Sequence, residues 1–368
     1  MGTTKPEFRS IVIFGGAGFI GSNWTERLLQ NTAAKVHVFD NLSRQGSRHN
    51  LEYLQKAAGR TGRLQVTVGD VRDASMVDRV LKYATEIYNF AAQVAVTTSL
   101  VDPKLDFDVN LGGTFNILEG IRQHGQNPYL LFTSTNKVYG NSKGGDVLVE
   151  SQRYVEPGRK GTDESQPLDF HSPYGCSKGA ADQYVHDYAR IYGVNSVVFR
   201  MSCIAGPRQF GSEDQGWVAH FLYSALEGKP LTIYGDGRQV RDILCVEDLL
   251  RAFESAYQNR EKTAGQIYNI GGGEGNTVSL LELMDRIEKL TGSRTGYNFG
   301  EQRSGDQLIY VTDHGKFSRD TGWTPSVDLD GTLKAILKWY RGNRELFAPS
   351  RAERLVQAGL LTPLRRTA

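Results

Sequence analysis

The sequence predicts an α/β fold, a Rossmann-type doubly wound parallel sheet joined to a smaller, mostly C-terminal α/β region. Short apolar runs alternate with amphipathic stretches of helical length from residue 11 to about residue 200, which is the pattern of a parallel sheet covered by helices. The first apolar run leads into a glycine-rich turn, and the second ends in an acidic residue. This order is typical of the first half of a dinucleotide-binding sheet.

The composition is that of an ordinary globular protein. The 368 residues carry a formal net charge of +2, with 39% hydrophobic and 23% charged residues, which gives no reason to expect nucleic acid or a membrane as partner. No stretch approaches the ~18 apolar residues of a membrane span, and the N-terminus lacks a signal-peptide pattern. Three widely spaced cysteines, in no metal-ligand spacing, predict reduced thiols, no metal and a cytoplasmic location.

The glycine-rich turn is the first candidate site. A strand is expected at 11–14 and a helix from the turn to Leu29. Glycines allow a tight turn and close approach of a pyrophosphate, and the helix N-terminus stabilises the anion. A turn that binds nothing is the weaker alternative. The expected pyrophosphate-binding residues are Gly15, Gly18, Phe19, Ile20 and Gly21.

Asp40 follows the second strand, expected at 35–39. An acid about ~20 residues after the turn can hydrogen-bond the adenosine ribose 2′-hydroxyl, and it would repel a 2′-phosphate. NAD is therefore favoured over NADP, although Arg44 leaves NADP open. Residues 41–50 are expected to form a loop over the adenosine, before a short helix at 51–56. Its expected cofactor contacts are Asn41, Ser43 and Arg44.

Two more strands, expected at 64–68 and 86–90, end in candidate contacts. After the first, Asp70 and Val71 can flank the adenine, or the segment can be a turn that caps a helix at 76–83. After the second, small residues suit the nicotinamide ribose and the substrate. These residues are Ala91, Ala92, Gln93 and Val94.

A helix is expected at 109–124, and Asn110 near its start is a candidate cofactor-binding residue that could instead be a structural hydrogen bonder. Gly112 and Gly113 inside it would each cost about ~1 kcal/mol, so we expect them to pack closely against a neighbour. A strand at 129–132 follows, and it delivers polar residues to the crevice edge of the sheet. These candidates are Ser134, Thr135, Asn136 and Lys137, of which Thr135 is the best candidate for the reacting oxygen.

Tyr174 and Lys178 stand four residues apart in a helix expected to run to Ile191, after a surface loop at 141–160. They would share one helix face, where a fixed cation lowers the pKa of a phenol and makes it a candidate acid and base. An isolated Y-x-x-x-K pair is more often an ordinary helix start. The preceding nucleotide-binding pattern favours the catalytic interpretation.

Beyond a sixth strand at 195–200 the alternation weakens. We expect an NAD-binding domain at 8–200, completed by returns at about 240–272, a mainly substrate-binding domain at 201–345, and a helix with a basic tail at 346–368. Further strands are expected at 231–234 and 267–270, and helices at 280–290 and 332–340. Candidate substrate residues are Ser202, Arg208, Gln209, Gln215, Gly216, Trp217, Val218, Arg241, Arg303 and Asp306. Arg241 and Arg303 could clamp a diphosphate, although single arginines are more often solvated.

The glycine turn, Asp40, Thr135, Tyr174 and Lys178, in this order, resemble the extended short-chain dehydrogenase/reductase family of nucleotide-sugar epimerases and dehydratases. The resemblance covers roughly residues 8–342. Longer runs are more specific, and they look like those of family members that invert C2 of a CDP-linked sugar. These runs span residues 40–44, 134–140, 168–184 and 214–218.

This resemblance implies a cycle of transient oxidation with NAD kept bound. Tyr174 would take a proton from a sugar hydroxyl while hydride passes to NAD, and Thr135 would hold the same oxygen. Lys178 would lower the Tyr174 pKa and bind the nicotinamide ribose. The keto sugar would then turn and receive the hydride on its other face, held by binding energy on the nucleotide. The expected partner is a nucleotide-diphosphate sugar, with CDP favoured, and the protein is expected to be a homodimer.

Two alternatives remain. A 4-epimerase or 4,6-dehydratase of the same family is one, but the dehydratases carry an Asp-Glu pair where this chain has Asn136 and Lys137, which disfavours elimination. A catalytically silent NAD-binding regulator is the other, and an intact Thr135, Tyr174 and Lys178 argue against it.

Overall fold

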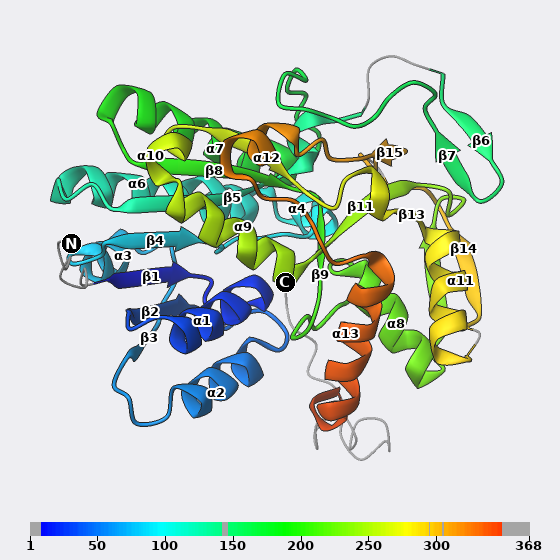
Figure 1. Cartoon of the computed structure of the whole chain (residues 1–368), viewed down its shortest axis with the longest axis horizontal. Coiled ribbons are helices and arrows are strands. Elements are labelled where there is room, and N and C mark those ends of the chain that lie inside the picture. Colours follow the sequence, from blue (N-terminus) through cyan, green and yellow to red (C-terminus); the bar gives the residue numbers. More distant parts are fainter. Residues whose placement is uncertain (1–8, 142–145, 294, 304, 348–368) are drawn as a thin grey trace.

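The computed structural model describes residues 9–141, 146–293, 295–303 and 305–347. Seven strands form a central sheet in the order β12-β8-β5-β4-β1-β2-β3, and every neighbouring pair is parallel (Figure 1). In chain order, they are β1 (Ser10–Phe14), β2 (Lys35–Asp40), β3 (Leu64–Val68), β4 (Glu86–Asn89), β5 (Tyr129–Thr135), β8 (Ser196–Met201) and β12 (Ile267–Ile270). The strand order reverses between β1 and β4, which opens a crevice at their carboxyl ends.

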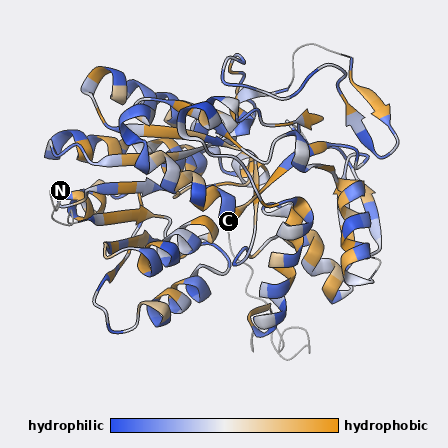
Figure 2. Ribbon diagram, in the orientation of Figure 1, coloured by the Kyte–Doolittle hydropathy of each residue, from blue (hydrophilic) through white to orange (hydrophobic). Residues whose placement is uncertain are grey.

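Both faces of this sheet are buried, as its apolar strands predict. Side chains of β1 alternate between two hydrophobic clusters, one on each face of the sheet. Ile11 and Ile13 belong to the first cluster, which includes Trp24. Val12 and Phe14 belong to the second. Figure 2 shows hydrophobic strands between helices whose outer faces are hydrophilic. The first cluster joins α1 (Phe19–Asn31) and α9 (Val246–Gln258). The second joins α3 (Ala74–Leu81), α6 (Gly113–His124) and α7 (Ser172–Tyr192).

The rest of the chain builds a third hydrophobic cluster, which lies around short strands. Strand β11 (Val240–Cys245) pairs with β9 (Cys203–Ala205), β13 (Thr277–Ser279) and β15 (Ile309–Tyr310). Strand β10 (Leu231–Tyr234) pairs with β14 (Tyr297–Gly300). Apolar faces of α8 (Trp217–Glu227), α11 (Leu280–Thr291) and α13 (Leu329–Gly342) pack together here.

Smaller elements complete the described chain. They are the helices α2 (Ser47–Ala58), α10 (Arg260–Thr263) and α12 (Gly315–Thr321), and 3₁₀ turns at Asn136–Tyr139, Glu274–Asn276 and Arg344–Phe347. No helix within the described ranges is long and apolar enough to cross a bilayer. Most of the expected tail at 346–368 lies outside the described residues.

The helix expected at 109–124 differs from the structure. Helices α4 (Val96–Val101) and α5 (Pro103–Phe107) lead into a π-helical turn, Asp108–Gly112, before α6 begins. A Cβ on Gly113 would lie 2.5 Å from Val71 Cγ2, so the expected close packing is correct there, whereas at Gly112 the nearest atom would be 3.9 Å away. Gly112 therefore lies in the π turn without such a constraint.

The surface loop expected at 141–160 is instead partly ordered as a hairpin. Strand β6 (Leu148–Glu150) pairs antiparallel with β7 (Arg153–Val155), and Figure 1 shows the hairpin projecting beside β13. Arg153 anchors it through an ion pair with Glu282, at 2.7 Å between Nε and Oε1. The hairpin was not predicted because its residues are mostly polar and because the residue that anchors it, Glu282, lies more than a hundred positions away in the sequence. Strand β11 and helix α9 were also not predicted from the sequence.

Candidate active site

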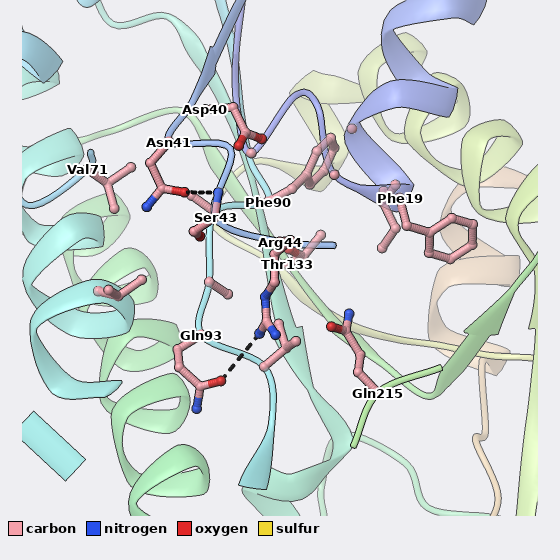
Figure 3. Close-up of a pocket in the computed structure, with 18 of the residues that line it drawn as sticks. Phe19, Asp40, Asn41, Ser43, Arg44, Val71, Phe90, Gln93, Thr133 and Gln215 are labelled. Carbon is pink, nitrogen blue, oxygen red and sulfur yellow. Dashed lines mark hydrogen bonds between the residues drawn. The ribbon is translucent and has the colours of Figure 1, made fainter. Parts of the chain in front are cut away.

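A cavity of about 460 Å³ opens at the carboxyl ends of the central strands (Figure 3). Its volume is within the roughly 300–1,000 Å³ of ordinary ligand sites. Nearly all the predicted cofactor residues line it: Gly15, Gly18, Phe19, Ile20, Gly21, Asp40, Asn41, Ser43, Arg44, Asp70, Val71, Ala91, Ala92, Gln93, Ser134, Tyr174 and Lys178. Four predicted substrate residues also line it: Val94, Arg208, Gln209 and Gln215.

The glycine turn is shaped by close packing of the backbone. Gly15 has φ +74°, and a Cβ there would lie 2.8 Å from the Ala91 nitrogen. At Gly21 a Cβ would lie 2.2 Å from the Gly15 carbonyl oxygen. Helix α1 then starts at Gly18 without a side-chain cap, so its first backbone N–H groups remain available to an anion in the cavity.

Asp40 lies at the end of β2 and is held by backbone N–H groups. Its Oδ2 accepts from Ala17 at 3.0 Å and its Oδ1 from Leu42 at 2.8 Å. Burial raises the pKa of the carboxyl, and these hydrogen bonds oppose that shift. On the neighbouring strand end, the Arg72 guanidinium lowers the pKa of Asp70 to about 2. Two carboxylates therefore face this part of the cavity.

Arg44 reaches away from Asp40 toward the Tyr174 end of the cavity. Its Nη2 donates to Gln93 Oε1 at 3.3 Å, a bond drawn in Figure 3. Burial lowers its pKa, and the electrostatic influence of Tyr174 and Asp214 opposes that shift. The Arg44 side chain therefore points away from the adenosine end of the cavity, over which its loop was expected to lie.

Tyr174 and Lys178 lie one turn apart on α7, and both are buried. Lys178 Nζ donates to the Thr133 carbonyl at 2.6 Å and lies 4.3 Å from the centre of the Phe132 ring. Its burial lowers the pKa of Lys178 to about 8. The Thr135 hydroxyl lies near enough to the Tyr174 phenol to lower its pKa, as expected if the two side chains act on the same oxygen.

The expected effect of Lys178 on Tyr174 is not what the structure shows. Burial raises the pKa of Tyr174 to about 12; the neighbouring Thr135 hydroxyl and the Arg44 charge lower it, while Asp106 raises it. The reason is geometric, since Lys178 directs its ammonium at the Thr133 carbonyl. In the protein alone, the cation that favours the phenolate is Arg44, which the sequence had assigned to the adenosine end.

Asn110 supports the cavity wall without lining the cavity. Its Oδ1 accepts from the Gln93 backbone N–H at 2.9 Å, and its Nδ2 donates to the Gln93 carbonyl at 3.0 Å. The same amide donates to Ser177 Oγ on α7 at 3.0 Å. These bonds fit a structural role for Asn110, which joins the end of β4 to the Tyr174 helix, whereas its predicted contact with the cofactor stays a prediction.

A cationic cluster lies beside Thr135, on the substrate side. Arg241 Nη2 lies 2.7 Å from Asp306 Oδ1, and Lys137 Nζ lies 3.3 Å from the same oxygen. Two cations thus share one carboxylate. Burial, and then the Arg241 charge, lower the pKa of Lys137. Asn136 joins the cluster through Gln307, at 3.3 Å between Nδ2 and Oε1.

Other predicted substrate residues have structural contacts. The Ser202 hydroxyl donates to Asp242, at 2.6 Å from Oδ1. Trp217 Nε1 lies 3.5 Å from Cys203 Sγ. The Arg303 guanidinium lies 3.9 Å from the centre of the Tyr234 ring. Gly216 adopts φ +73° ahead of α8.

Val218 is 2% exposed, so its side chain does not face the cavity. It lies one residue after Trp217, at the start of α8, and packs in the cluster formed by α8, α11 and α13.

The sequence analysis missed several lining residues. Three of them, Phe90, Thr133 and Met201, stand at the carboxyl ends of β4, β5 and β8. Their position after predicted strands was an available signal, because such ends meet at one edge of the sheet. Phe210 and Thr98 also line the cavity. They come from segments whose fold was not predicted, and no local pattern marked them.

Comparisons with known proteins agree on one family. A family model described as "NAD dependent epimerase/dehydratase family" matches residues 11–271. The chain is 42% identical over 337 residues to CDP-paratose 2-epimerase of Salmonella typhi, covering 89% of this chain and 98% of the relative. Among solved structures, a Bacillus cereus UDP-glucuronic acid 4-epimerase with UDP-glucuronic acid and NAD aligns with TM-score 0.79 and 27% identity, covering 90% and 99%. A Streptomyces venezuelae dTDP-glucose 4,6-dehydratase with NAD bound aligns with TM-score 0.79 and 30% identity, covering 91% and 98%.

Proposed function

Because the chain belongs to the NAD-dependent epimerase/dehydratase family, we propose that it inverts C2 of a CDP-linked sugar by transient oxidation and re-reduction. The observation that carries the reaction type is the buried Tyr174 side chain, which lines the cavity and has the Thr135 hydroxyl beside its phenol. The choice of C2 and of CDP is supported by the relative from Salmonella typhi, whose name specifies both.

NAD is the cofactor of this family, and the cavity fits a dinucleotide in three respects. The N-terminus of α1 is uncapped by any side chain and its first residues line the cavity, which suits a pyrophosphate. Asp40 stands at the end of β2, where a ribose diol would be bound. The buried Ser134 hydroxyl has no hydrogen-bond partner among the described residues, so a ligand would satisfy it. When bound, NAD supplies an acceptor that takes a hydride and returns it.

Tyr174 is the proposed acid and base. As phenolate it would accept the proton of the C2 hydroxyl, and as phenol it would return that proton to the same oxygen. Thr135 would hold this oxygen beside it. Arg44 places positive charge near the phenol, which favours its ionised form. The Tyr174 pKa of about 12 in the protein alone means that added positive charge is needed for much phenolate to form at neutral pH.

The cationic cluster is the proposed diphosphate site. Arg241 and Lys137 are two cations that pair with the single carboxylate of Asp306. The cluster therefore has a net positive charge, which would attract an anion. A guanidinium can bind two phosphate oxygens in parallel. Arg303, at the neighbouring loop and facing Asp214 at 3.6 Å, would add a third cation if it leaves that weak ion pair.

The test is incubation with CDP-, UDP-, GDP- and ADP-sugars in deuterated water, followed by NMR of the product. We expect inversion at C2 of a CDP-sugar with no deuterium at carbon, because the hydride returns from the cofactor rather than from solvent. Inversion at C4, or loss of water to give a deoxy keto sugar, would assign the chain to another reaction of the family. Tight NAD binding without turnover of any sugar would support the silent regulator.

We also propose that the protein is a cytoplasmic homodimer, joined through α6 and α7. Their outer faces carry exposed apolar side chains: Phe115 at 41%, Tyr184 at 44%, Tyr192 at 54% and Ile191 at 65%. Phe115 and Tyr184 touch edge to face, with ring centroids 5.9 Å apart, so the two helices present one patch. Such patches often mark interfaces. The free cysteines fit a reducing compartment.

Light scattering after gel filtration tests the interface. The native chain should have twice the mass of the monomer, and Tyr184→Lys should shift it toward the monomer. Tyr83→Lys is the matched control, since Tyr83 is 70% exposed and belongs to neither α6 nor α7. A native monomer, or a Tyr184→Lys dimer, would reject this interface.

A further inference from the structure

Asp106 is a fully buried carboxylate next to the proposed catalytic pair. It lies on α5 at 0% exposure. Its Oδ1 accepts from Gln93 Nε2 at 2.9 Å and from Asn110 Nδ2 at 3.2 Å, and its Oδ2 accepts from the Ser177 hydroxyl. Ser177 stands between Tyr174 and Lys178 on α7, and Gln93 lines the cavity. One carboxylate therefore joins the α7 site to the cavity wall.

The amide orientations in this network are fixed by the backbone. Gln93 Oε1 accepts from the Ala95 N–H and its Nε2 donates to the Ala95 carbonyl, both at 2.7 Å. Asn110 is oriented in the same way by the N–H and the carbonyl of Gln93. Both amides must therefore present N–H groups to Asp106. Ser177 accepts from Asn110 and so has its own proton free to donate.

Asp106 thus receives hydrogen bonds on both oxygens, as an ionised carboxylate does. Its three donors are neutral side chains, so these bonds leave its negative charge in place. A buried charge costs free energy unless its surroundings stabilise it. An asparagine at position 106 would have nearly the same size and would avoid this cost. The charge of Asp106 therefore needs a reason other than packing, and we infer that the reason is its effect on the neighbouring ionisable groups.

We propose that Asp106 is a positioning residue that fixes Gln93 and the Tyr174–Lys178 turn of α7, and that its negative charge sets the balance between phenol and phenolate at Tyr174. The inference rests on the proposed role of Tyr174 as acid and base. A tyrosine that must both take and return a proton works poorly if either form is too stable. Arg44 stabilises the phenolate from the β2 side, and Asp106 opposes it from α5.

The charged groups around the Tyr174 side chain come from three elements. Arg44 lies in the loop after β2, Asp106 on α5 and Lys178 on α7. Asp106 raises the pKa of Tyr174 and also supports the charged form of Lys178, as does Asp182. Removing the charge of Asp106 should therefore make both groups lose their protons at lower pH.

The test compares Asp106→Asn, which removes the charge and keeps the size, with Asp106→Ala, which removes the hydrogen bonds as well. Asp108→Asn is the matched control. Asp108 lies two residues after Asp106, and its side chain forms an ion pair with the exposed Lys104 at 2.5 Å. In the NAD-loaded protein, the acid limb of kcat/KM should move to lower pH by roughly 0.5–1 unit in both Asp106 variants. Only Asp106→Ala should also weaken NAD binding, by roughly tenfold, since it leaves Gln93 and Asn110 without the oxygen acceptor that the amide of Asp106→Asn retains. Asp108→Asn should match the native protein.

A second readout does not depend on the substrate. With ¹³Cζ-labelled tyrosine and NAD bound, the Tyr174 resonance, identified by its loss in Tyr174→Phe, should titrate at lower pH in Asp106→Asn than in the native protein. If no sugar is turned over, the proposed function fails while this titration still decides the role of Asp106. Equal pH dependence of native protein and Asp106→Asn in the NMR titration would overturn the inference. A shift in Asp108→Asn as large as that in Asp106→Asn would overturn it as well.

Discussion

The two sides of the cleft hold their charges in opposite ways. On the cofactor side, Asp40 and Asp106 accept hydrogen bonds from neutral donors, which do not neutralise a carboxylate charge. On the substrate side, Lys137 and Arg241 share the one carboxylate of Asp306, which leaves positive charge in excess. Adjacent sites of opposite sign can hold a cationic ring and a diphosphate in fixed order, which favours productive orientation before any chemistry occurs.

The largest effect should come from the residue between these two sides. Tyr174→Phe removes the proton acceptor and should lower kcat by at least about 10³-fold, the scale of general acid–base catalysis. NAD affinity measured by calorimetry should change little, since the ring remains. Near-native turnover would show that the cleft uses another base.

Arg241→Gln probes the substrate side. The loss of a charge-assisted hydrogen bond of about 1.5–3 kcal/mol should raise KM for the nucleotide sugar roughly 10- to 100-fold. NAD binding should be unaffected. Arg286→Gln is the matched control, because Arg286 pairs with Asp330 at 2.7 Å and both side chains are about half exposed. If both variants have the same KM, the cationic cluster does not bind the diphosphate.

Lys178→Met tests the free-energy cost of the buried cation. The pKa of Lys178 is lowered to about 8 in the folded protein and is about 10.4 when unfolded, so the unfolded chain binds more protons between these values. Native stability therefore rises with pH across this window, and below about pH 8 the full cost remains. At pH 7 the variant should be more stable by about 1–3 kcal/mol, a gain that shrinks above pH 8.

Urea unfolding at pH 7 and pH 10 measures this difference. Lys104→Met provides the control, since the Lys104 side chain is 83% exposed. A Lys178→Met protein that is less stable than native at pH 7 would mean that the Thr133 and Phe132 contacts outweigh the burial of charge.

The smallest effect is expected at Asp40. Asp40→Ala should weaken NAD binding roughly tenfold, about 1.4 kcal/mol, and NADP binding less, because the carboxylate also repels a 2′-phosphate. Asp40→Asn keeps one of the two acceptor oxygens that bind the Ala17 and Leu42 N–H groups, so it removes the charge with less damage to the turn than Asp40→Ala. Equal losses for both cofactors would remove Asp40 from the ribose site.

The cofactor side could be read from the sequence because its signals are local. Gly15 to Gly21 and Asp40 each follow a short apolar strand, and parallel strands bring such ends together. The direction of the Arg44 side chain could not be read, since it depends on Gln93, which lies 49 positions away. The hairpin at β6 and β7 and the role of Asp306 depend in the same way on distant partners.

The same limit explains the error at Lys178. Helical spacing predicts that Tyr174 and Lys178 share a face, which the structure confirms, but not that the Thr133 carbonyl turns the ammonium toward β5. The carboxylate of Asp106 was missed entirely. It sits in a short helix of ordinary polar sequence, and only its contacts with Gln93, Asn110 and Ser177 make it notable.

The most direct measurement of the account follows a deuterium label placed at C2 of a CDP-linked sugar. After incubation in ordinary water with the NAD-loaded protein, NMR should show inverted configuration at C2 with the deuterium still on that carbon, and no inversion with Tyr174→Phe. Replacement of the label by solvent hydrogen would contradict hydride return, and unchanged C2 configuration would contradict the assigned carbon.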